Sequence, residues 1–399
     1  MLIQRMMKKF IAPLLSPPIQ VTLVIAIIFL FGNIIPHGVL QGLLTASSLV
    51  LTALKLCLPW LVMSFLFLSL SRMQSGVIGF VITLIVFFIA SNFIANLYGF
   101  GAAHILKTYP ELCPTRAEEV KKALVPFFQS DLKPLIPTQI GLALGFFLGF
   151  MARFMPAKVF TQSEIIARRF IDIFINKFFV PLLPIFVGGF VAQLHYEGLL
   201  DNIFQDYAPL VGLIFGFQIL YCFFILLLAT KFNFTAFKKL FKDMIPPYIT
   251  GMMTLSGSAA LPQSLKAVKK NIKDPSMADA FLPPATNVHL LGDGTSVPFL
   301  IFATAIAFGQ AIPDTATLIS SALFMAFLRF GIVSIPGGGI FVMIPVMTNS
   351  FGFTQEMTGL ITAIYILFDI FNTANNVLAN GASAVLFCNT WTAFKTKKK

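Results

Sequence analysis

The chain has 399 residues, of which 57% are hydrophobic and only 11% are Asp, Glu, Lys or Arg. A soluble domain of this size keeps more charge in contact with water, so the composition excludes a soluble protein and indicates an integral membrane protein. The formal net charge of +12 does not indicate a nucleic-acid-binding protein, because the basic residues gather in the connections between apolar segments.

These basic connections alternate with connections that lack Lys and Arg, around His37, Leu194–Asn202, Phe308–Thr317 and Phe351–Thr358. Basic connections of membrane proteins lie in the cytoplasm. We therefore expect both termini in the cytoplasm and an even number of crossings. The basic clusters are Arg5–Lys9, Arg72, Arg153–Arg169, Lys231–Lys242, Lys266–Lys273 and Lys395–Lys399.

Apolar runs long enough to cross a membrane recur along the chain. Met73–Leu106 contains no Asp, Glu, Lys or Arg, and a helix needs only about 20 apolar residues to cross hydrocarbon. The other runs lie near 18–36, 39–71, 135–152, 170–194, 207–230, 279–309, 316–348 and 357–388. The charge alternation accommodates fewer spans than this. We predict an all-α membrane protein with about eight transmembrane helices and two re-entrant helical hairpins.

The two hairpins are placed by Ser/Gly/Pro interruptions of apolar sequence. Thr254-Leu-Ser-Gly-Ser-Ala-Ala-Leu-Pro262 has basic residues at both ends of its run, whereas Ser334-Ile-Pro-Gly-Gly-Gly339 has lysine-free connections at both ends. The first hairpin is therefore expected to enter from the cytoplasm and the second from outside. Between them, Gly292-Asp-Gly-Thr-Ser296 is a further intramembrane run that we expect to be irregular. Irregular backbone at membrane depth lines a cavity or is buried in protein, so these segments indicate a transporter's binding site.

The last apolar run contains a carboxylate, Asp369, more than ten residues from its start. Thr373 and Asn376 follow at i+4 and i+7, on the same face of a helix. Asp369 is costly in a membrane without a partner, so it either pairs with a neighbouring helix or receives a cationic group of a substrate. In the second case, the substrate's ammonium group would lie at Asp369, and the substrate's own carboxylate would be bound by Thr373, Asn376 and the hairpin N-termini. This arrangement favours an amino acid over a plain dicarboxylate.

Five motifs in this order resemble the dicarboxylate/amino acid:cation symporter family, which includes the glutamate transporters, over nearly the whole chain. The motifs are Leu54-Lys-Leu-Cys-Leu-Pro-Trp-Leu-Val62, the Ser-rich tip with Leu261-Pro262, Leu291-Gly-Asp-Gly-Thr295, Ile335-Pro-Gly-Gly-Gly339 and Asp369-Ile-Phe-Asn-Thr-Ala-Asn-Asn-Val377.

The resemblance implies inverted repeats, a homotrimer and an elevator-like movement of one domain. It divides the chain into residues 1–235, mainly the scaffold of spans 1, 2, 4 and 5 with the peripheral spans 3 and 6 of the transport domain, and residues 236–399, the core transport domain of hairpin 1, span 7, hairpin 2 and span 8. The protein is expected in an inner or plasma membrane.

The family's substrate residues map onto both hairpin tips and the last two spans. They are Ser256, Gly257, Ser258, Thr295, Ile335, Pro336, Gly337, Gly339, Asp369, Asn372, Thr373 and Asn376. Members that carry acidic substrates have an arginine where this chain has Asn372, and an amide cannot replace the charged guanidinium fork. We therefore expect a neutral, small or polar amino acid.

The family's cation positions are changed as well. A sodium-binding Asp is replaced by Asn380, and an Asn and a Met by Leu291 and Gly292, whereas Asp293 is retained. Hard cations require several oxygen ligands, some of them charged, so we favour H⁺ over Na⁺ as the coupling ion. The expected ion- or proton-coupling residues are His289, Asp293, Arg329, Asn376 and Asn380.

Two of these residues allow more than one interpretation. His289 either carries a proton, since the ordinary pKa of His lies near neutrality, or is a core histidine with its hydrogen bonds satisfied. Arg329 replaces a sodium ion, pairs with Asp293 or Asp369, or reads a second substrate carboxylate.

The sequence thus predicts a secondary active amino-acid symporter with no cofactor, no enzymatic activity and no nucleic-acid partner. Its expected partners are the amino acid, the co-transported cation and the lipid bilayer. The alternatives are an acidic amino acid or dicarboxylate symporter that uses Arg329, an uncoupled exchanger or substrate-gated channel on the same scaffold, and a receptor without transport.

Overall fold

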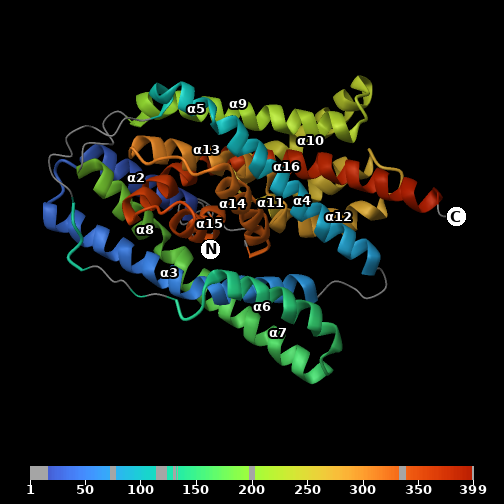
Figure 1. Cartoon of the computed structure of the whole chain (residues 1–399), viewed down its shortest axis with the longest axis horizontal. Helices are drawn as coiled ribbons and strands as arrows, with labels where there is room; N and C mark the ends of the chain where they lie inside the picture. The colour runs from blue at the N-terminus through green and yellow to red at the C-terminus, as the bar shows by residue number, and fades with distance from the viewer. Residues whose placement is uncertain are drawn as a thin grey trace, which may run out of the picture. The chain divides into compact units, whose positions relative to one another are not determined.

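The computed structural model describes residues 17–397 except 72–77, 114–123, 129–131, 133, 197–202 and 332–337. Every regular element in this part of the chain is helical (Figure 1). The prediction of an all-α protein is thereby confirmed for the described residues. The chain divides into two compact units.

Unit 1 comprises residues 1–71, 114–206 and 354–363. Its helices are α2 (Pro17–Phe31), α3 (His37–Ser71), α6 (Thr138–Met151), η3 (Ala152–Phe154), α7 (Ala157–Ile171), the π-helical η4 (Asp172–Phe179), α8 (Val180–Tyr196) and the first part of α16 (Gln355–Lys397).

Small residues bring the long helix α3 close to its neighbours. A Cβ atom at Gly141 of α6 would collide with the backbone carbonyl of Pro59. On the other side, Ser47 Oγ donates a 2.5 Å hydrogen bond to the carbonyl oxygen of Phe186 in α8. Close backbone approach at small residues is the usual way in which membrane helices associate.

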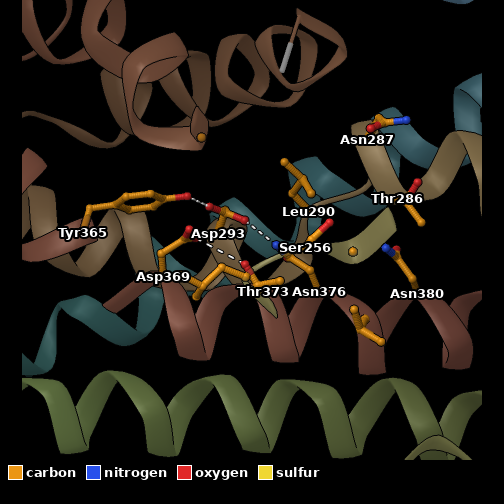
Figure 2. A pocket seen from close by; sticks show the side chains of 14 residues that line it. Ser256, Thr286, Asn287, Leu290, Asp293, Tyr365, Asp369, Thr373, Asn376 and Asn380 are labelled. Atoms are coloured by element: carbon orange, nitrogen blue, oxygen red, sulfur yellow. Dashed lines mark hydrogen bonds between the residues drawn. The ribbon is translucent and has the colours of Figure 1, made fainter. Parts of the chain in front are cut away.

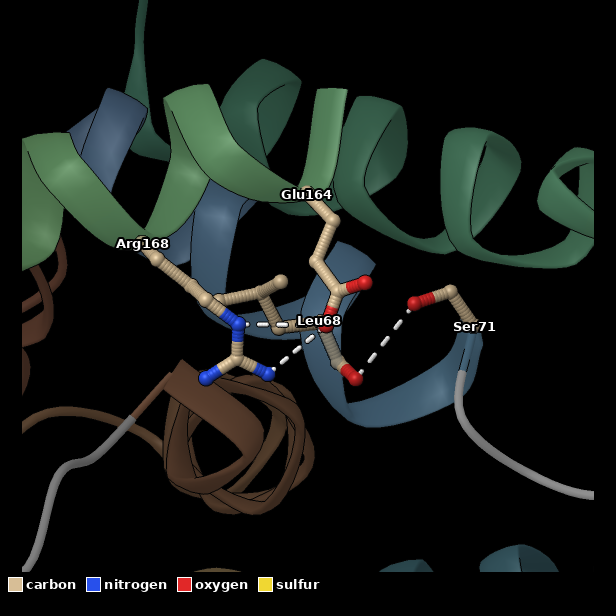
Figure 3. Close-up of polar contacts among 4 residues, drawn as sticks. All are labelled: Leu68, Ser71, Glu164 and Arg168. Atoms are coloured by element: carbon tan, nitrogen blue, oxygen red, sulfur yellow. Dashed lines mark hydrogen bonds and ion pairs between the residues drawn. The ribbon is translucent and has the colours of Figure 1, made fainter. Parts of the chain in front are cut away.

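The polar ends of α3 and α7 are shown in Figure 3. Arg168 and Glu164 form an ion pair one helical turn apart in α7, with a 2.8 Å separation between Nη2 and Oε1. Ser71 Oγ donates to the carbonyl of Leu68 and so satisfies an acceptor at the end of α3. Both contacts are local, and exposed pairs of this kind add little to stability.

Unit 2 comprises residues 72–113, 207–353 and 364–399. Its helices are α4 (Ile78–Ala103), α5 (Ile105–Thr108), η2 (Pro110–Leu112), α9 (Ile203–Ala229), α10 (Phe234–Thr254), α11 (Gly257–Lys269), α12 (Ser276–Val288), α13 (Leu291–Ala307), α14 (Thr315–Leu328), η5 (Arg329–Gly331), α15 (Gly338–Asn349) and most of α16.

The first interruption forms a helical hairpin. Helices α10 and α11 pack against each other and are joined at Leu255, whose φ of +51° is left-handed, and Ser256. Ser256 Oγ accepts a hydrogen bond from the backbone N–H of Ala259 and so caps α11. Helices α14 and α15 flank the second interruption, but most of its tip lies outside the described residues.

The irregular run expected at Gly292–Ser296 is instead helical and belongs to the first turns of α13. The chain is interrupted just before it, at His289 and Leu290, where α12 ends and α13 begins. The run is helical because its glycines allow close helix packing. A Cβ atom at Gly292 would lie 2.6 Å from the carbonyl oxygen of Asn372 in α16, and one at Gly294 would lie 2.7 Å from Cβ of Ala95 in α4.

Three helical segments of the described chain are by themselves long and apolar enough to cross a membrane: Ile82–Thr108, Ala208–Ala229 and Ser276–Ala307. Two further bent helix pairs, in α7–α8 and in α16, raise this number to five if each pair is one span. Several membrane spans are therefore present, and the total of eight stays a prediction.

Candidate functional site

A cavity in unit 2 collects most of the polar residues that the sequence singles out (Figure 2). It holds about 50 Å³, which is room for roughly four waters because one water needs about 10–15 Å³. The cavity is therefore sized for a small polar solute. Its lining residues are Leu255, Ser256, Gly257, Thr286, Asn287, Leu290, Asp293, Gly339, Tyr365, Asp369, Thr373, Asn376, Val377 and Asn380.

Three helices begin at this cavity. Ser256 and Gly257 form the N-terminus of α11, Leu290 caps α13, and Gly339 lies in the first turn of α15. A helix N-terminus carries unpaired backbone N–H groups and a partial positive charge. At α13 the Gly292 N–H is already bonded to Asn376, and Asp293 places a carboxylate in the first turn. The ends suited to a further anionic group are therefore those of α11 and α15.

Helix α16 supplies the opposing wall. Tyr365, Asp369, Thr373, Asn376 and Asn380 recur at three- and four-residue spacing and so share one face. Asp369 is only 6% exposed and accepts a long hydrogen bond of 3.5 Å from Thr373 Oγ1. Its carboxylate gives this wall a negative charge within reach of a cationic group.

A second carboxylate, Asp293, is bound by the protein on both of its oxygens. Its Oδ1 accepts from the Tyr365 hydroxyl, and its Oδ2 accepts from Asn376 Nδ2 at 2.6 Å (Figure 2). Asn376 Oδ1 in turn accepts from the backbone N–H of Gly292 at 2.7 Å. Asp293 also lies in the first turn of α13, where the helix dipole stabilises negative charge.

Many of the predicted site residues come together here. The cavity is lined by Ser256, Gly257, Gly339, Asp369, Thr373 and Asn376 of the predicted substrate set and by Asp293 and Asn380 of the predicted coupling set. Ile335, Pro336 and Gly337 lie outside the described residues.

Three predicted substrate residues do not line the cavity. Ser258 is exposed in the first turn of α11. The hydroxyl of Thr295 donates within α13, to the carbonyl of Gly292 at 2.8 Å. Asn372 is fully buried and is not part of the lining; its Oδ1 accepts from Gln218 Nε2 at 2.7 Å and from Ser296 Oγ at 2.8 Å.

Arg329 also lies away from the lining and is completely buried. Its guanidinium donates to the backbone carbonyl of Leu290 and, at 2.7 Å, to Asn96 Oδ1, whereas its Nε has no hydrogen-bond partner. Neither Asp293 nor Asp369 forms an ion pair with Arg329 among the described residues. The Arg329 guanidinium thus donates to oxygen atoms next to the α12–α13 break.

His289, at the same break, has a partner on each ring nitrogen. Nδ1 lies 2.6 Å from Asn380 Oδ1, and Nε2 lies 2.9 Å from Ser91 Oγ. The ring is completely buried and packs against Phe88 and Phe281. His289 therefore reaches the cavity only through Asn380.

Several residues of the site were not singled out by the sequence. Tyr365 precedes Asp369 by one helical turn, and this i−4 spacing could have placed it on the same face. Asn287, Thr286 and Leu290 line the cavity because the helix break lies earlier than the sequence suggested. Gln218 stands alone in an apolar helix, and only the fold brings it to Asn372.

The chain is similar to known proteins over most of its length. Residues 18–390 match the model of the sodium:dicarboxylate symporter family. The serine/threonine transporter SstT of one Acinetobacter baumannii strain is 23% identical over 386 residues, which covers 92% of this chain and 93% of that protein. The SstT transporter of Acinetobacter baylyi is 21% identical over 210 residues, 52% of each chain. Since the family model covers nearly the whole chain, this protein belongs to the sodium:dicarboxylate symporter family and is a multi-pass membrane transporter, not an enzyme.

Proposed function

We propose that this protein is a secondary active symporter of a small neutral amino acid. The observation that carries the proposal is the polarity of the cavity, with Asp369 on one wall and the N-termini of α11 and α15 opposite. An α-ammonium group would pair with Asp369, and an α-carboxylate would accept from the backbone N–H groups. A plain dicarboxylate has no ammonium group to compensate Asp369.

A neutral side chain is favoured over an acidic one by the described lining, which contains no Arg or Lys. The arginine of acidic-substrate members is replaced by Asn372, and Arg329 is committed to Leu290 and Asn96. An acidic substrate side chain would thus be a buried charge without a partner. The names of the SstT relatives, which specify serine and threonine, point in the same direction.

Transport by purified protein in liposomes tests this proposal. Labelled serine, threonine, alanine, asparagine, aspartate and succinate are offered under an imposed sodium gradient and, separately, an imposed proton gradient. We expect accumulation of one or more neutral amino acids and weak uptake of aspartate and succinate. Aspartate uptake that outcompetes serine, alanine and asparagine would overturn the substrate assignment.

We favour a proton over sodium as the coupling ion, because backbone carbonyl oxygens at the α12–α13 break already accept hydrogen bonds from protein side chains. Asn92 Nδ2 donates to the carbonyl of Val288 at 2.8 Å, and Arg329 donates to that of Leu290. These oxygens are the kind of ligand that a sodium ion would use. Arg329 supplies a fixed positive charge at this position in place of one ion.

His289 is the proposed proton carrier. Asn380 Nδ2 donates to the carbonyl of Ala285. Asn380 Oδ1 therefore faces the imidazole ring. Because this oxygen can only accept, we assign a proton to His289 Nδ1. The neutral ring then accepts from Ser91 at Nε2. Rotation of the Ser91 hydroxyl would let Nε2 take up a second proton without movement of heavier atoms.

The coupling proposal is tested with His289→Ala in the same liposomes. His104→Ala is the control, because the His104 ring bonds to the carbonyl of Phe100, four residues earlier, and does not line the cavity. We expect His289→Ala to lose accumulation driven by a proton gradient but to retain counterflow exchange of labelled substrate. Unchanged proton-driven accumulation in His289→Ala would remove His289 from the coupling mechanism.

An uncoupled exchanger is the second candidate, and the fixed cation Arg329 is the observation that favours it. A carrier with a built-in charge at this position needs fewer ions from solution to complete its cycle. Counterflow without any ion gradient, together with no accumulation under either gradient, would support this alternative. An Arg329→Ala variant with unchanged ion dependence would instead exclude a role for this cation in coupling.

We further propose that unit 2 is the mobile transport domain and unit 1 the scaffold of an elevator-type carrier. In support, every described lining residue belongs to unit 2. The scaffold would form a homotrimer, with both termini in the cytoplasm and the hairpins opening on opposite sides of an inner or plasma membrane.

A further inference from the structure

Gln218 is a buried amide in the middle of the apolar helix α9, 1% exposed and outside the cavity lining. We propose that Gln218 is a positioning residue that determines which substrate side chains the carrier accepts, and that it acts through Asn372. This inference rests on the proposed amino-acid transport.

The orientation of the Gln218 amide is set by a backbone group. Its Nε2 donates to the carbonyl of Gly292 at 2.9 Å, and a carbonyl can only accept a hydrogen bond. The same Nε2 donates to Asn372 Oδ1 at 2.7 Å. On the other side, Gln218 Oε1 accepts from Asn375 Nδ2 at 2.8 Å. The two α16 amides are therefore oriented by Gln218.

This orientation leaves one group of Asn372 unused. Its oxygen accepts from both Gln218 and Ser296, which occupies both lone pairs. Its Nδ2 is buried and has no hydrogen-bond partner. Unpaired buried donors are costly, so we infer that a bound substrate completes the hydrogen bonding of Asn372 Nδ2.

Asn372 lies at the margin of the substrate cavity. It follows Asp369 by three residues and precedes Asn376 by four, and both of these line the cavity, so it adjoins their face of α16. A substrate side chain that reaches Asn372 thus meets a donor and no acceptor. Hydroxyl and amide oxygens can accept from it, whereas a methyl group leaves it unpaired and an ammonium group opposes it.

Ser296 cannot impose this polarity by itself. A hydroxyl either donates or accepts, so without Gln218 the Asn372 amide could turn over and present its oxygen. Gln218 lacks this freedom because the Gly292 carbonyl holds its N–H₂ group in place. Gln218 therefore determines that Asn372 presents its N–H₂ group, and not its oxygen, to a substrate.

The test compares serine and alanine transport by Gln218→Met, which keeps the side-chain length and removes the amide. We expect the KM for serine to rise about tenfold, the effect of one lost hydrogen bond, and the KM for alanine to change less than twofold. Cys222→Ala is the matched control, because Cys222 lies one turn further along α9 and its thiol donates to a backbone carbonyl, that of Asn375, and to no amide side chain among the described residues. It should leave the serine-to-alanine ratio of KM values unchanged.

A double-mutant cycle then separates positioning from packing. If Gln218 acts through Asn372, Gln218→Met should not change the serine-to-alanine ratio further in an Asn372→Ala background. Equal changes for serine and alanine, or independent effects of the two substitutions, would overturn the inference.

Alanine transport by each variant reports that the protein is folded. If Gln218→Met is inactive toward both substrates, Ser296→Ala serves instead, because it removes the other donor to Asn372 Oδ1. It should shift the serine-to-alanine ratio of KM values in the same direction, by a smaller factor. An unchanged ratio would contradict the inference. If the unmodified protein transports no neutral amino acid, the proposed function itself fails, and that result is distinguishable from loss of discrimination.

Discussion

Two carboxylates, Asp293 and Asp369, line the same cavity. Asp293 is held by Tyr365 and Asn376, so its charge is largely satisfied by the protein. Asp369 accepts from Thr373 Oγ1 at 3.5 Å and lines the cavity that a substrate would fill (Figure 2). At the level of single residues, Asp369 is therefore the group that should bind the ammonium of an amino acid.

Replacement of Asp369 by Asn tests this role. The amide keeps the size of the side chain but loses the charge, so we expect substrate affinity to fall about 10–100-fold, as for a lost charge-assisted hydrogen bond. Competitive uptake in liposomes measures the effect. Asp279→Asn is the control, because Asp279 pairs with Lys269 away from the cavity. An unchanged substrate affinity in Asp369→Asn would contradict the assignment.

At the scale of helices, the cavity depends on how closely α13 approaches α16. The backbone N–H of Gly292 binds Asn376, and its carbonyl binds Gln218. The backbone of Gly292 thus connects Asn376, which lines the cavity, with the buried amide of Gln218. The absence of a side chain at 292 is what allows this contact. The structure therefore explains the glycine by packing, independently of any lost ion ligand.

A Gly292→Ala substitution should disrupt this packing. Its Cβ would lie 2.6 Å from the carbonyl oxygen of Asn372 and 3.0 Å from Asn376 Oδ1. Overpacking of this kind costs about 1–3 kcal/mol, so we expect a lower Tm in detergent and weaker substrate binding.

Gly212→Ala in α9 provides the contrast, because nothing lies within 4 Å of the Cβ that it adds. It should keep or raise the Tm, since alanine is the better helix former. Equal melting temperatures for the two alanine variants would mean that the α13–α16 contact is looser than described.

At the scale of the whole molecule, the charge alternation predicts which connections face the cytoplasm. Lys273 and Ala311 are both exposed and lie at the ends of the segment that contains α12 and α13. We expect a cysteine at 311 to react with a membrane-impermeant maleimide in intact cells. A cysteine at 273 should react only after the membrane is permeabilised, in a background without Cys57, Cys113, Cys222 and Cys388. Labelling of both from outside would exclude the predicted topology.

Assembly is the second prediction at this scale. The family resemblance implies three copies of the 43.9 kDa chain. Native mass spectrometry of the protein released from detergent should detect a species with three times the mass of the monomer. A monomer that remains active in liposomes would show that the transport function does not need the trimer.

Local signals in the sequence anticipated much of the site. Ser256, Gly257 and Gly339 stand out as breakers of apolar runs, and Asp369, Thr373 and Asn376 share a face through helical periodicity alone. All six line the cavity. The position of the helix break was wrong by two or three residues, because the Gly-Asp-Gly run suggested irregular backbone but serves close packing.

The sequence by itself determined the membrane class, the helical fold, the family and the face of α16 that carries Asp369, because these follow from composition, periodicity and short motifs. Only the tertiary structure decided that Asn372 and Arg329 are buried outside the cavity lining and that Gln218, 154 residues from Asn372, binds it. Hydrogen bonds between distant segments depend on how helices pack. No local sequence pattern predicts which donor will bond to which acceptor.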